Sequence, residues 1–238
     1  MQVDFTIRDW AAWAPGLTSP EAWRAWAAGP PRAPRGPETP ALEEVPALAR
    51  RRVEKVGRAA FQVAAWCQGE ARGLPLVFAS RHGAVVRSVE LLTELARGEV
   101  LSPTGFALSV HNAVAAQYSI IRGERGNVSA VSNGRFTLEA GVIEAVALLL
   151  EAPQVVLVVH EGSGPQAYAH FLEEPEADFA FAWKLERGAA FSLRSLEPSP
   201  PRPAELPHAL RVLRFFLARE PSLAVGDETA AWHWGRGA

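Results

Sequence analysis

The sequence predicts an α/β domain in which helices cover a sheet. Short apolar runs suited to buried strands alternate with segments whose apolar residues recur at the helical spacing, and this alternation is typical of layered α/β folds. The clearest case is Leu101 to Gly162, which predicts a loop, a helix, a buried strand, a turn, a second helix and a second buried strand. A chain of 238 residues is long enough for one substantial domain, which we expect to span residues 1–238.

The N-terminal region predicts a strand, a tryptophan-bearing segment and a helix. Polar and apolar residues alternate over residues 2–7, as in a half-buried strand, and tryptophans follow in residues 9–14 and 20–28. Ser19, Pro20 and Glu21 form a helix-start signal in which Ser19 is the expected N-cap. Residues 30–40 hold five prolines and predict an exposed, irregular loop within the domain.

The middle of the chain predicts further helices and strands. Residues 45–68 predict one long amphipathic helix, with Leu48 on its apolar face. The helix predicted over residues 84–97 has four inward-facing positions: Val85, Val89, Leu92 and Leu95. The other predicted elements are strands at 74–79, 127–132, 154–160 and 178–185, a strand at 190–193 paired with the preceding one across Arg187-Gly188, and helices at 112–122, 137–151 and 207–218.

Composition excludes several classes of function. A formal net charge of −2 with scattered basic residues gives no indication of nucleic-acid binding. One cysteine, Cys67, excludes an intrachain disulfide and fits a reducing compartment, and no apolar run approaches the ~18 residues of a membrane span. The N-terminus lacks a signal-peptide pattern, so we expect a cytoplasmic protein. The six histidines lack metal-ligand spacing, and the sequence predicts no metal and no cofactor.

The turn at Ser132-Asn133-Gly134 is the position where chemistry is expected. A strand that leads into a helix N-terminus presents backbone N–H donors and a positive dipole end, which suit an activated nucleophile or an oxyanion. The turn offers Ser, Asn, Gly and Arg, and no cysteine. Cys67 lies within a predicted helix and is interpreted as structural, and Asn112 is interpreted as a helix cap. These residues alone give no convincing catalytic set.

The segment SVHNAVAAQYSIIRGERGNVSAVSNG resembles the condensing-enzyme segment of β-ketoacyl synthases in the thiolase superfamily. That segment runs from a helix start through an alanine-rich helix to a strand ending in Thr-Ala-Cys. VPALARRRVEKVGRAAFQVA is similar to the arginine-rich helix of those enzymes. VFASRHG and LSPTGFALSVHNA are similar to the small β-ketoacyl synthase-like subunits of aryl-polyene-type clusters, described as chain length factors. The resemblance covers about residues 1–190.

The resemblance implies a thiolase-like half, a layered α-β-α arrangement with a mixed sheet, without the complete C-terminal half of a ketosynthase. Ser132 falls on the family's Thr, Asn133 on its Ala and Gly134 on its nucleophilic Cys; a shift of one residue would put Arg135 there instead. Neither Gly134 nor Arg135 can attack a thioester, because covalent catalysis there needs a thiolate. The resemblance therefore implies that the chain has no catalytic residue at this turn.

The implied function is that of a non-catalytic, chain length factor-like subunit. It would pair with an active β-ketoacyl-ACP synthase in fatty acid or polyketide biosynthesis of the aryl polyene type, and would meet acyl carrier protein only indirectly. Two alternatives stay open: a stand-alone acyl-transfer or thioesterase-like enzyme using Ser132, Ser163 or Cys67, and a homodimeric scaffold that binds acyl chains or carrier protein. The residues expected at the partner interface or along an acyl tunnel are His111, Asn112, Ala116, Val128, Ala130, Ser132 and Asn133.

Overall fold

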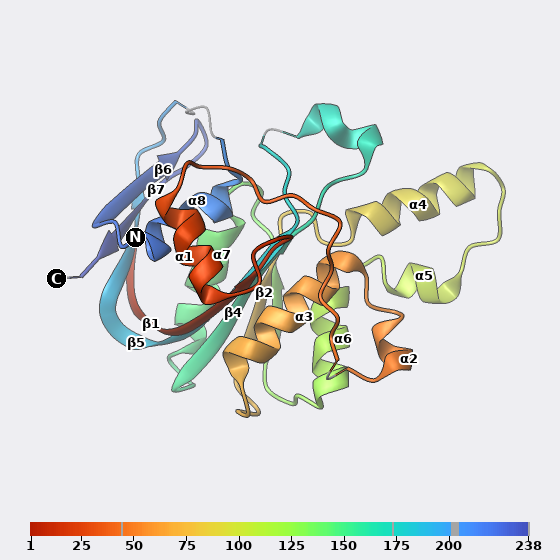
Figure 1. Ribbon diagram of the computed structural model, residues 1–238, viewed down its shortest axis with the longest axis horizontal. Coiled ribbons are helices and arrows are strands. Elements are labelled where there is room, and N and C mark those ends of the chain that lie inside the picture. Colours follow the sequence, from red (N-terminus) through yellow and green to blue (C-terminus); the bar gives the residue numbers. More distant parts are fainter. Residues whose placement is uncertain (44, 173, 201–204, 238) are drawn as a thin grey trace.

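A mixed seven-stranded sheet forms the centre of the molecule (Figure 1). The computed structural model describes residues 1–43, 45–172, 174–200 and 205–237. Its strands are β1 (Gln2–Trp13), β2 (Leu76–Ala79), β3 (Val128–Val131), β4 (Gln154–Glu161), β5 (Phe179–Leu196), β6 (Ser222–Gly226) and β7 (Ala231–Arg236). The order is β3-β2-β4-β5-β7-β6, and β1 also pairs with β5. Strands β2, β3 and β4 are parallel, and the other pairs are antiparallel.

Helices cover both faces of this sheet, so the predicted layered α/β architecture is confirmed. They are α1 (Pro20–Ala28), α2 (Ala47–Arg50), α3 (Lys55–Gln68), α4 (Val85–Ala96), α5 (Pro103–Ala107), α6 (Ala113–Arg122), α7 (Thr137–Leu148) and α8 (His208–Leu217), with the 3₁₀ helix η1 (Gln166–Phe171). Alternate side chains of a strand point to opposite faces. Leu76 and Phe78 therefore pack with α3 and α6, while Val77 and Ala79 pack with α7, in a second core that also holds α1 and α8.

The N-terminal strand is longer than its alternation pattern predicts, because β1 continues to Trp13. The predicted helix over residues 20–28 matches α1, and the Ser19 hydroxyl accepts the N–H of Ala22 at 3.2 Å, as expected of its N-cap. Trp13 and Trp23 are both buried. The tryptophan-rich N-terminus therefore supplies core side chains on both faces of the sheet.

The prediction of one continuous helix over residues 45–68 is wrong. Helix α2 ends at Arg50 and α3 begins at Lys55. The Arg58 guanidinium donates to the carbonyl oxygens of Val53 (3.1 Å) and Arg50 (3.2 Å), so a side chain replaces the helical N–H donors at the break. Leu48, expected on the core face, is 70% exposed.

Helix α4 lies where it was predicted, but two of the side chains predicted to face the core are exposed. Leu92 and Leu95 are 58% and 57% exposed, whereas Leu91 is buried. Figure 1 shows why: α4 and α5 project from one side of the molecule instead of lying over the sheet. An amphipathic pattern reveals an apolar face, but it does not reveal whether the same chain covers that face.

The predicted pairing of residues 178–185 with 190–193 is also wrong. Both segments belong to the single strand β5, and each pairs with β1. The register steps from Phe5↔Phe191 to Thr6↔Glu186, so residues 187–190 form a bulge that bends the strand. Glycine suits position 188, because a Cβ there would overlap Thr6 Oγ1. A turn-like dipeptide thus marks a bulge and not a hairpin.

Candidate functional site

The carboxyl ends of the parallel strands β2, β3 and β4 meet at one edge of the sheet, the usual place for ligand sites in α/β folds. There a tight turn leads from β3 into α7. Gly134 adopts a left-handed conformation with φ of +53°. Thr137 fixes the turn, since its Oγ1 accepts the N–H of Asn133 (2.9 Å) and donates to the carbonyl oxygen of Gly134 (2.7 Å).

The turn itself is accessible. Ser132, Asn133 and Gly134 are exposed, and a Cβ built on Gly134 would meet no atom within 4 Å. The residues present supply a hydroxyl, an amide and backbone groups, but no thiol. The turn can therefore donate hydrogen bonds, whereas it has no group that forms a thioester.

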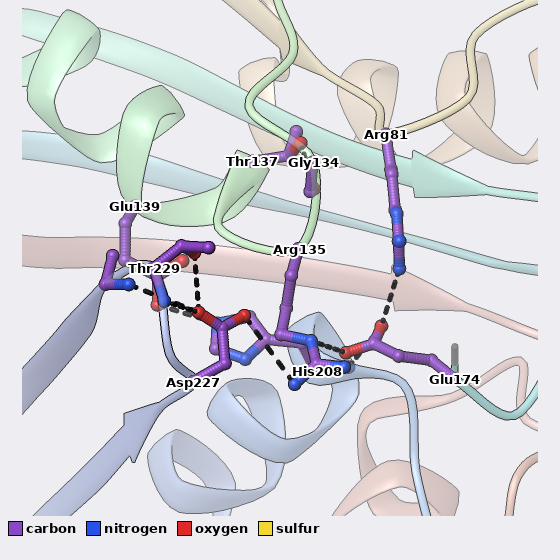
Figure 2. Close-up of polar contacts among 10 residues, drawn as sticks. Arg81, Gly134, Arg135, Thr137, Glu139, Glu174, His208, Asp227 and Thr229 are labelled. Carbon is purple, nitrogen blue, oxygen red and sulfur yellow. Dashed lines mark hydrogen bonds and ion pairs between the residues drawn. The ribbon is translucent and has the colours of Figure 1, made fainter. Parts of the chain in front are cut away.

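Arg135 directs its side chain away from the turn into a cluster of charges (Figure 2). Its guanidinium forms ion pairs with Glu174 (3.1 Å) and Asp227 (3.8 Å). Arg81, which follows β2, reaches Glu174 from the other side at 3.6 Å. The four side chains are between 14% and 19% exposed, so cations and anions alternate in a largely buried network.

Both carboxylates of this network are held by further groups. Glu174 accepts the backbone N–H of His208 at 3.2 Å. Asp227 accepts from the N–H and hydroxyl of Thr229, at 2.8 and 2.6 Å. Burial would raise the pKa of Asp227, but these hydrogen bonds, the N–H of Ala230 and the charge of Arg135 outweigh it and lower the pKa below its usual range. The anions that hold Arg135 therefore have fixed positions.

A third acidic side chain, that of Glu161, ends β4 beside this network. Its carboxyl accepts the backbone N–H of Arg81 and the hydroxyl of Ser80. Burial raises the pKa of Glu161 to about 8, even though these hydrogen bonds favour the charged form. Burial, helped by the charge of His111, lowers the pKa of the adjacent His160 to about 3. Both groups are therefore neutral at mildly acidic pH.

The space enclosed at this edge is small. A cavity of about 50 Å³ is bordered by Arg81, Glu161, Glu174, Phe179 and other residues. One water occupies about 30 Å³ of liquid, and pockets for organic ligands span roughly 300–1,000 Å³. The cavity therefore has room for a water or two beside the ion pairs.

The predicted interface and tunnel residues lie around the same end of the sheet and along its edge. His111 places Nε2 2.8 Å from the carbonyl oxygen of Ser80. Asn112 occupies the predicted N-cap position of α6, but its exposed side chain makes no capping hydrogen bond. Ala116 lies on α6, and Val128 and Ala130 are half-buried in the edge strand β3.

The alternative nucleophiles have other partners. Ser132 Oγ donates to the carbonyl oxygen of Arg81 (3.1 Å), and Ser163 Oγ donates to Asp178 (3.2 Å). Cys67 is buried in the core, and burial, with a smaller effect from the charge of Asp9, raises the pKa of its thiol to about 12, as expected of a structural cysteine. Within the described residues, none of these three side chains has a hydrogen bond to a histidine, which a hydrolase-type nucleophile needs.

Several residues of the site were not predicted. Arg81 lies two residues after the strand predicted at 74–79, and Glu161 directly follows the strand predicted at 154–160. The rule that sites gather at the carboxyl ends of parallel strands could therefore have found both. Glu174 and Asp227 come from distant loops, for which the sequence carries no comparable signal. Within the described residues, no cluster of three or more His, Cys, Asp or Glu side chains has a metal-binding arrangement, and no helix is long and apolar enough to span a bilayer.

Comparisons with known proteins identify the family. A family model, "Beta-ketoacyl synthase, N-terminal domain", matches residues 23–235. A chain of the solved complex of the ketosynthase ApeO with its chain length factor ApeC, from Xenorhabdus doucetiae, is 31% identical. The match covers 98% of this chain and 100% of that chain, with a TM-score of 0.89. A search of curated proteins finds no match.

More distant structures share the fold. A chain of the ishigamide ketosynthase/chain length factor has 12% identity and a TM-score of 0.66, over 82% of this chain and 67% of that chain. A β-ketoacyl synthase from Burkholderia phymatum has 13% identity and a TM-score of 0.58, over 91% and 70%. The expected thiolase-like fold of a ketosynthase N-terminal half is confirmed. Since the family model spans most of the sequence, the chain belongs to the β-ketoacyl synthase N-terminal domain family.

Proposed function

We propose that this chain is a catalytically silent, chain length factor-like subunit that pairs with an active β-ketoacyl-ACP synthase in fatty acid or polyketide biosynthesis of the aryl polyene type. The observation that carries the proposal is the turn between β3 and α7. In this proposal Gly134, or Arg135 one residue on, takes the position of the family's nucleophile. Gly134 has no side chain and the Arg135 guanidinium is engaged by two carboxylates, so neither residue can carry an acyl group.

The surface around β3 supports the pairing. Strand β3 ends the sheet, with β2 as its neighbour, and an open edge strand is a template for another strand. Exposed apolar side chains lie on the helices α4, α5 and α6: Leu92, Leu95, Phe106 and Ile120. Apolar surface of this kind is typical of contacts between proteins. The solved Xenorhabdus doucetiae structure is such a complex, of a ketosynthase with its chain length factor.

In such a pair the synthase supplies the reactive cysteine and receives the acyl carrier protein. This chain would bound the space for the growing product and stabilise its partner in the cytoplasm. The residues expected to meet the partner or the product are those around the edge strand and the turn: His111, Asn112, Ala116, Val128, Ala130, Ser132 and Asn133.

The test is to purify the chain alone, a β-ketoacyl-ACP synthase from the same source alone, and the two together after co-expression. We expect no malonyl condensation on carrier protein by this chain alone, and condensation by the complex. Condensation by the lone chain, or an acyl group covalently attached to it during turnover, would contradict the proposal. A stable homodimer that leaves the synthase unbound would favour the scaffold alternative.

A further inference from the structure

We propose that Glu161 is a positioning residue that holds the loop at the base of α4 and thereby sets the direction in which the α4–α5 arm (residues 84–110) meets the paired synthase. The inference rests on the proposed function, in which exposed apolar side chains of this arm contact the synthase. It explains how a projecting element of the chain presents a fixed surface to another protein.

The arm projects from the body of the molecule, so its direction is set at its base (Figure 1). In the described part of the chain, no side chain of α4 or α5 belongs to either core of the sheet. Leu91, the buried side chain of α4, lies over Gly105 of α5, where a Cβ would come within 3.5 Å of Leu91 Cδ2. Leu92, Leu95 and Phe106 are each more than half exposed. The arm therefore packs on itself and depends on its base for its orientation.

The carboxyl group of Glu161 reaches the outgoing end of this base, residues 80–84. Strands β2 and β4 are parallel neighbours, so Glu161 at the end of β4 lies beside the loop that leaves β2. Its carboxyl accepts the backbone N–H of Arg81 and the hydroxyl of Ser80, the latter at 3.4 Å. The same hydroxyl accepts the N–H of Gly83 at 2.8 Å. One carboxyl thus fixes two backbone N–H groups just before α4, one of them through Ser80.

The returning end of the arm is joined to the same loop. His111 Nε2 lies 2.8 Å from the carbonyl oxygen of Ser80. The imidazole packs on Gly83, where a Cβ would come within 2.7 Å of His111 Cδ2. Further along the arm, Ser88 Oγ donates to the carbonyl oxygen of Ser109 at 3.2 Å. Since both ends of the arm are joined at this loop, a shift of the loop turns the arm as a unit.

Two substitutions of similar length separate the hydrogen bonds of Glu161 from its size. Glu161→Gln keeps an oxygen that accepts the N–H of Arg81. Glu161→Met leaves this N–H without an acceptor, which is unfavourable unless the loop moves or water enters. Glu90→Gln is the matched control, because it neutralises an exposed carboxylate on α4 itself. The ion pair between Arg87 and Glu54 is present in all three variants and keeps the arm near the start of α3.

The experiment measures the distance between spin labels on the exposed positions of Ala96→Cys, in the arm, and Ala147→Cys, on α7. Cys67 is buried and the pKa of its thiol is raised, so it does not react with the label. On the isolated chain, double electron–electron resonance should give one narrow distance distribution for the parent, Glu161→Gln and Glu90→Gln. For Glu161→Met we expect a distribution about twofold wider. Co-purification of the synthase with unlabelled Glu161→Met should fall about fivefold, because only a fraction of the arms then point in the binding direction.

A distribution for Glu161→Met as narrow as that for Glu161→Gln would overturn the inference, as would equal widening in both. Undiminished pairing of Glu161→Met with a widened distribution would overturn it as well. If circular dichroism shows that Glu161→Met does not fold, Ser80→Ala, which removes the link from the carboxyl to Gly83, carries the same expectation. The distances in the isolated chain do not depend on pairing. A wild-type chain that does not bind the synthase would therefore remove the proposed function, while the distances still test the positioning role.

Discussion

Glu161 and His160 show how one strand end can hold two ionisable groups in their neutral forms. Successive side chains of β4 point to opposite faces of the sheet, so each group is buried among different neighbours. Burial raises the pKa of Glu161 to about 8 and lowers the pKa of His160 to about 3. Since burial disfavours the charged form of both an acid and a base, the two shifts have opposite signs and the same main cause.

We expect the free energy of unfolding to fall between pH 6.5 and 8. The pKa of Glu161 is higher in the folded chain than in the unfolded chain, so the folded state binds more protons in this window. As the pH rises, the free energy of unfolding therefore falls by up to about 1.4 kcal/mol per pH unit. The pKa values of His160 and His82 are lowered in the folded chain. Below pH 6.5 the unfolded state therefore binds more protons at these histidines, and they lower the free energy of unfolding as the pH falls.

Urea unfolding at several pH values checks this expectation. Glu161→Gln keeps an oxygen to accept the N–H of Arg81 but does not titrate, so its stability should change little from pH 6.5 to 8. A wild-type profile as flat as that of Glu161→Gln would show that the Glu161 carboxyl is already ionised at pH 6.5.

At the scale of elements, the open edge of β3 makes the pairing proposal testable. The carbonyl oxygens of Asn127 and Val131 accept the N–H groups of Leu76 and Ser80. Every second residue of β3 therefore bonds β2, and the N–H of Ala130 lies between these positions and points out of the sheet. Proline at position 130 removes an outward donor and leaves the ladder to β2 intact.

We therefore expect Ala130→Pro to reduce co-purification of the synthase at least tenfold while the chain stays folded. Ser129→Pro is the matched control, because position 129 faces β2 and proline there should lower the melting temperature of the chain itself. Pull-down and thermal melting measure the two effects. Undiminished pairing of Ala130→Pro would mean that β3 does not form strand pairs with the partner.

The sequence could predict elements wherever the signal was local. The Ser19-Pro20 start marked α1, and short apolar runs indicated the buried strands β2 and β4. It failed where a distant contact decides the outcome, as when β1 holds both halves of β5. It also failed where a side chain takes over backbone acceptors, as Arg58 does between α2 and α3. The same limit applies to the site: the turn before α7 was predictable, whereas Glu174 and Asp227, which hold Arg135, were not.

For the whole molecule, a buried polar group joins the site helix to the C-terminal segment. Glu139, in the first turn of α7, is fully buried. Its Oε1 lies 2.8 Å from His208 Nε2 and accepts the N–H of Trp234 Nε1 at 2.9 Å. One side chain thus ties α7, α8 and β7 together, below the turn that carries Arg135.

Removal of the Glu139 carboxyl group should destabilise the packing of α8 and β7 on α7 more than removal of any single exposed acidic side chain. Glu139→Ala leaves the buried N–H of Trp234 without an acceptor and His208 Nε2 without its hydrogen-bond partner, and we expect the free energy of unfolding to fall by roughly 3 kcal/mol. Glu139→Gln keeps one acceptor oxygen and should cost about 1 kcal/mol, while the exposed Glu90→Ala should stay within about 0.5 kcal/mol of wild type. Urea unfolding measures all three. Equal stability of Glu139→Ala and Glu90→Ala would mean that the packing of Trp234 against Phe5 and Trp183 is enough to hold the C-terminal segment on α7.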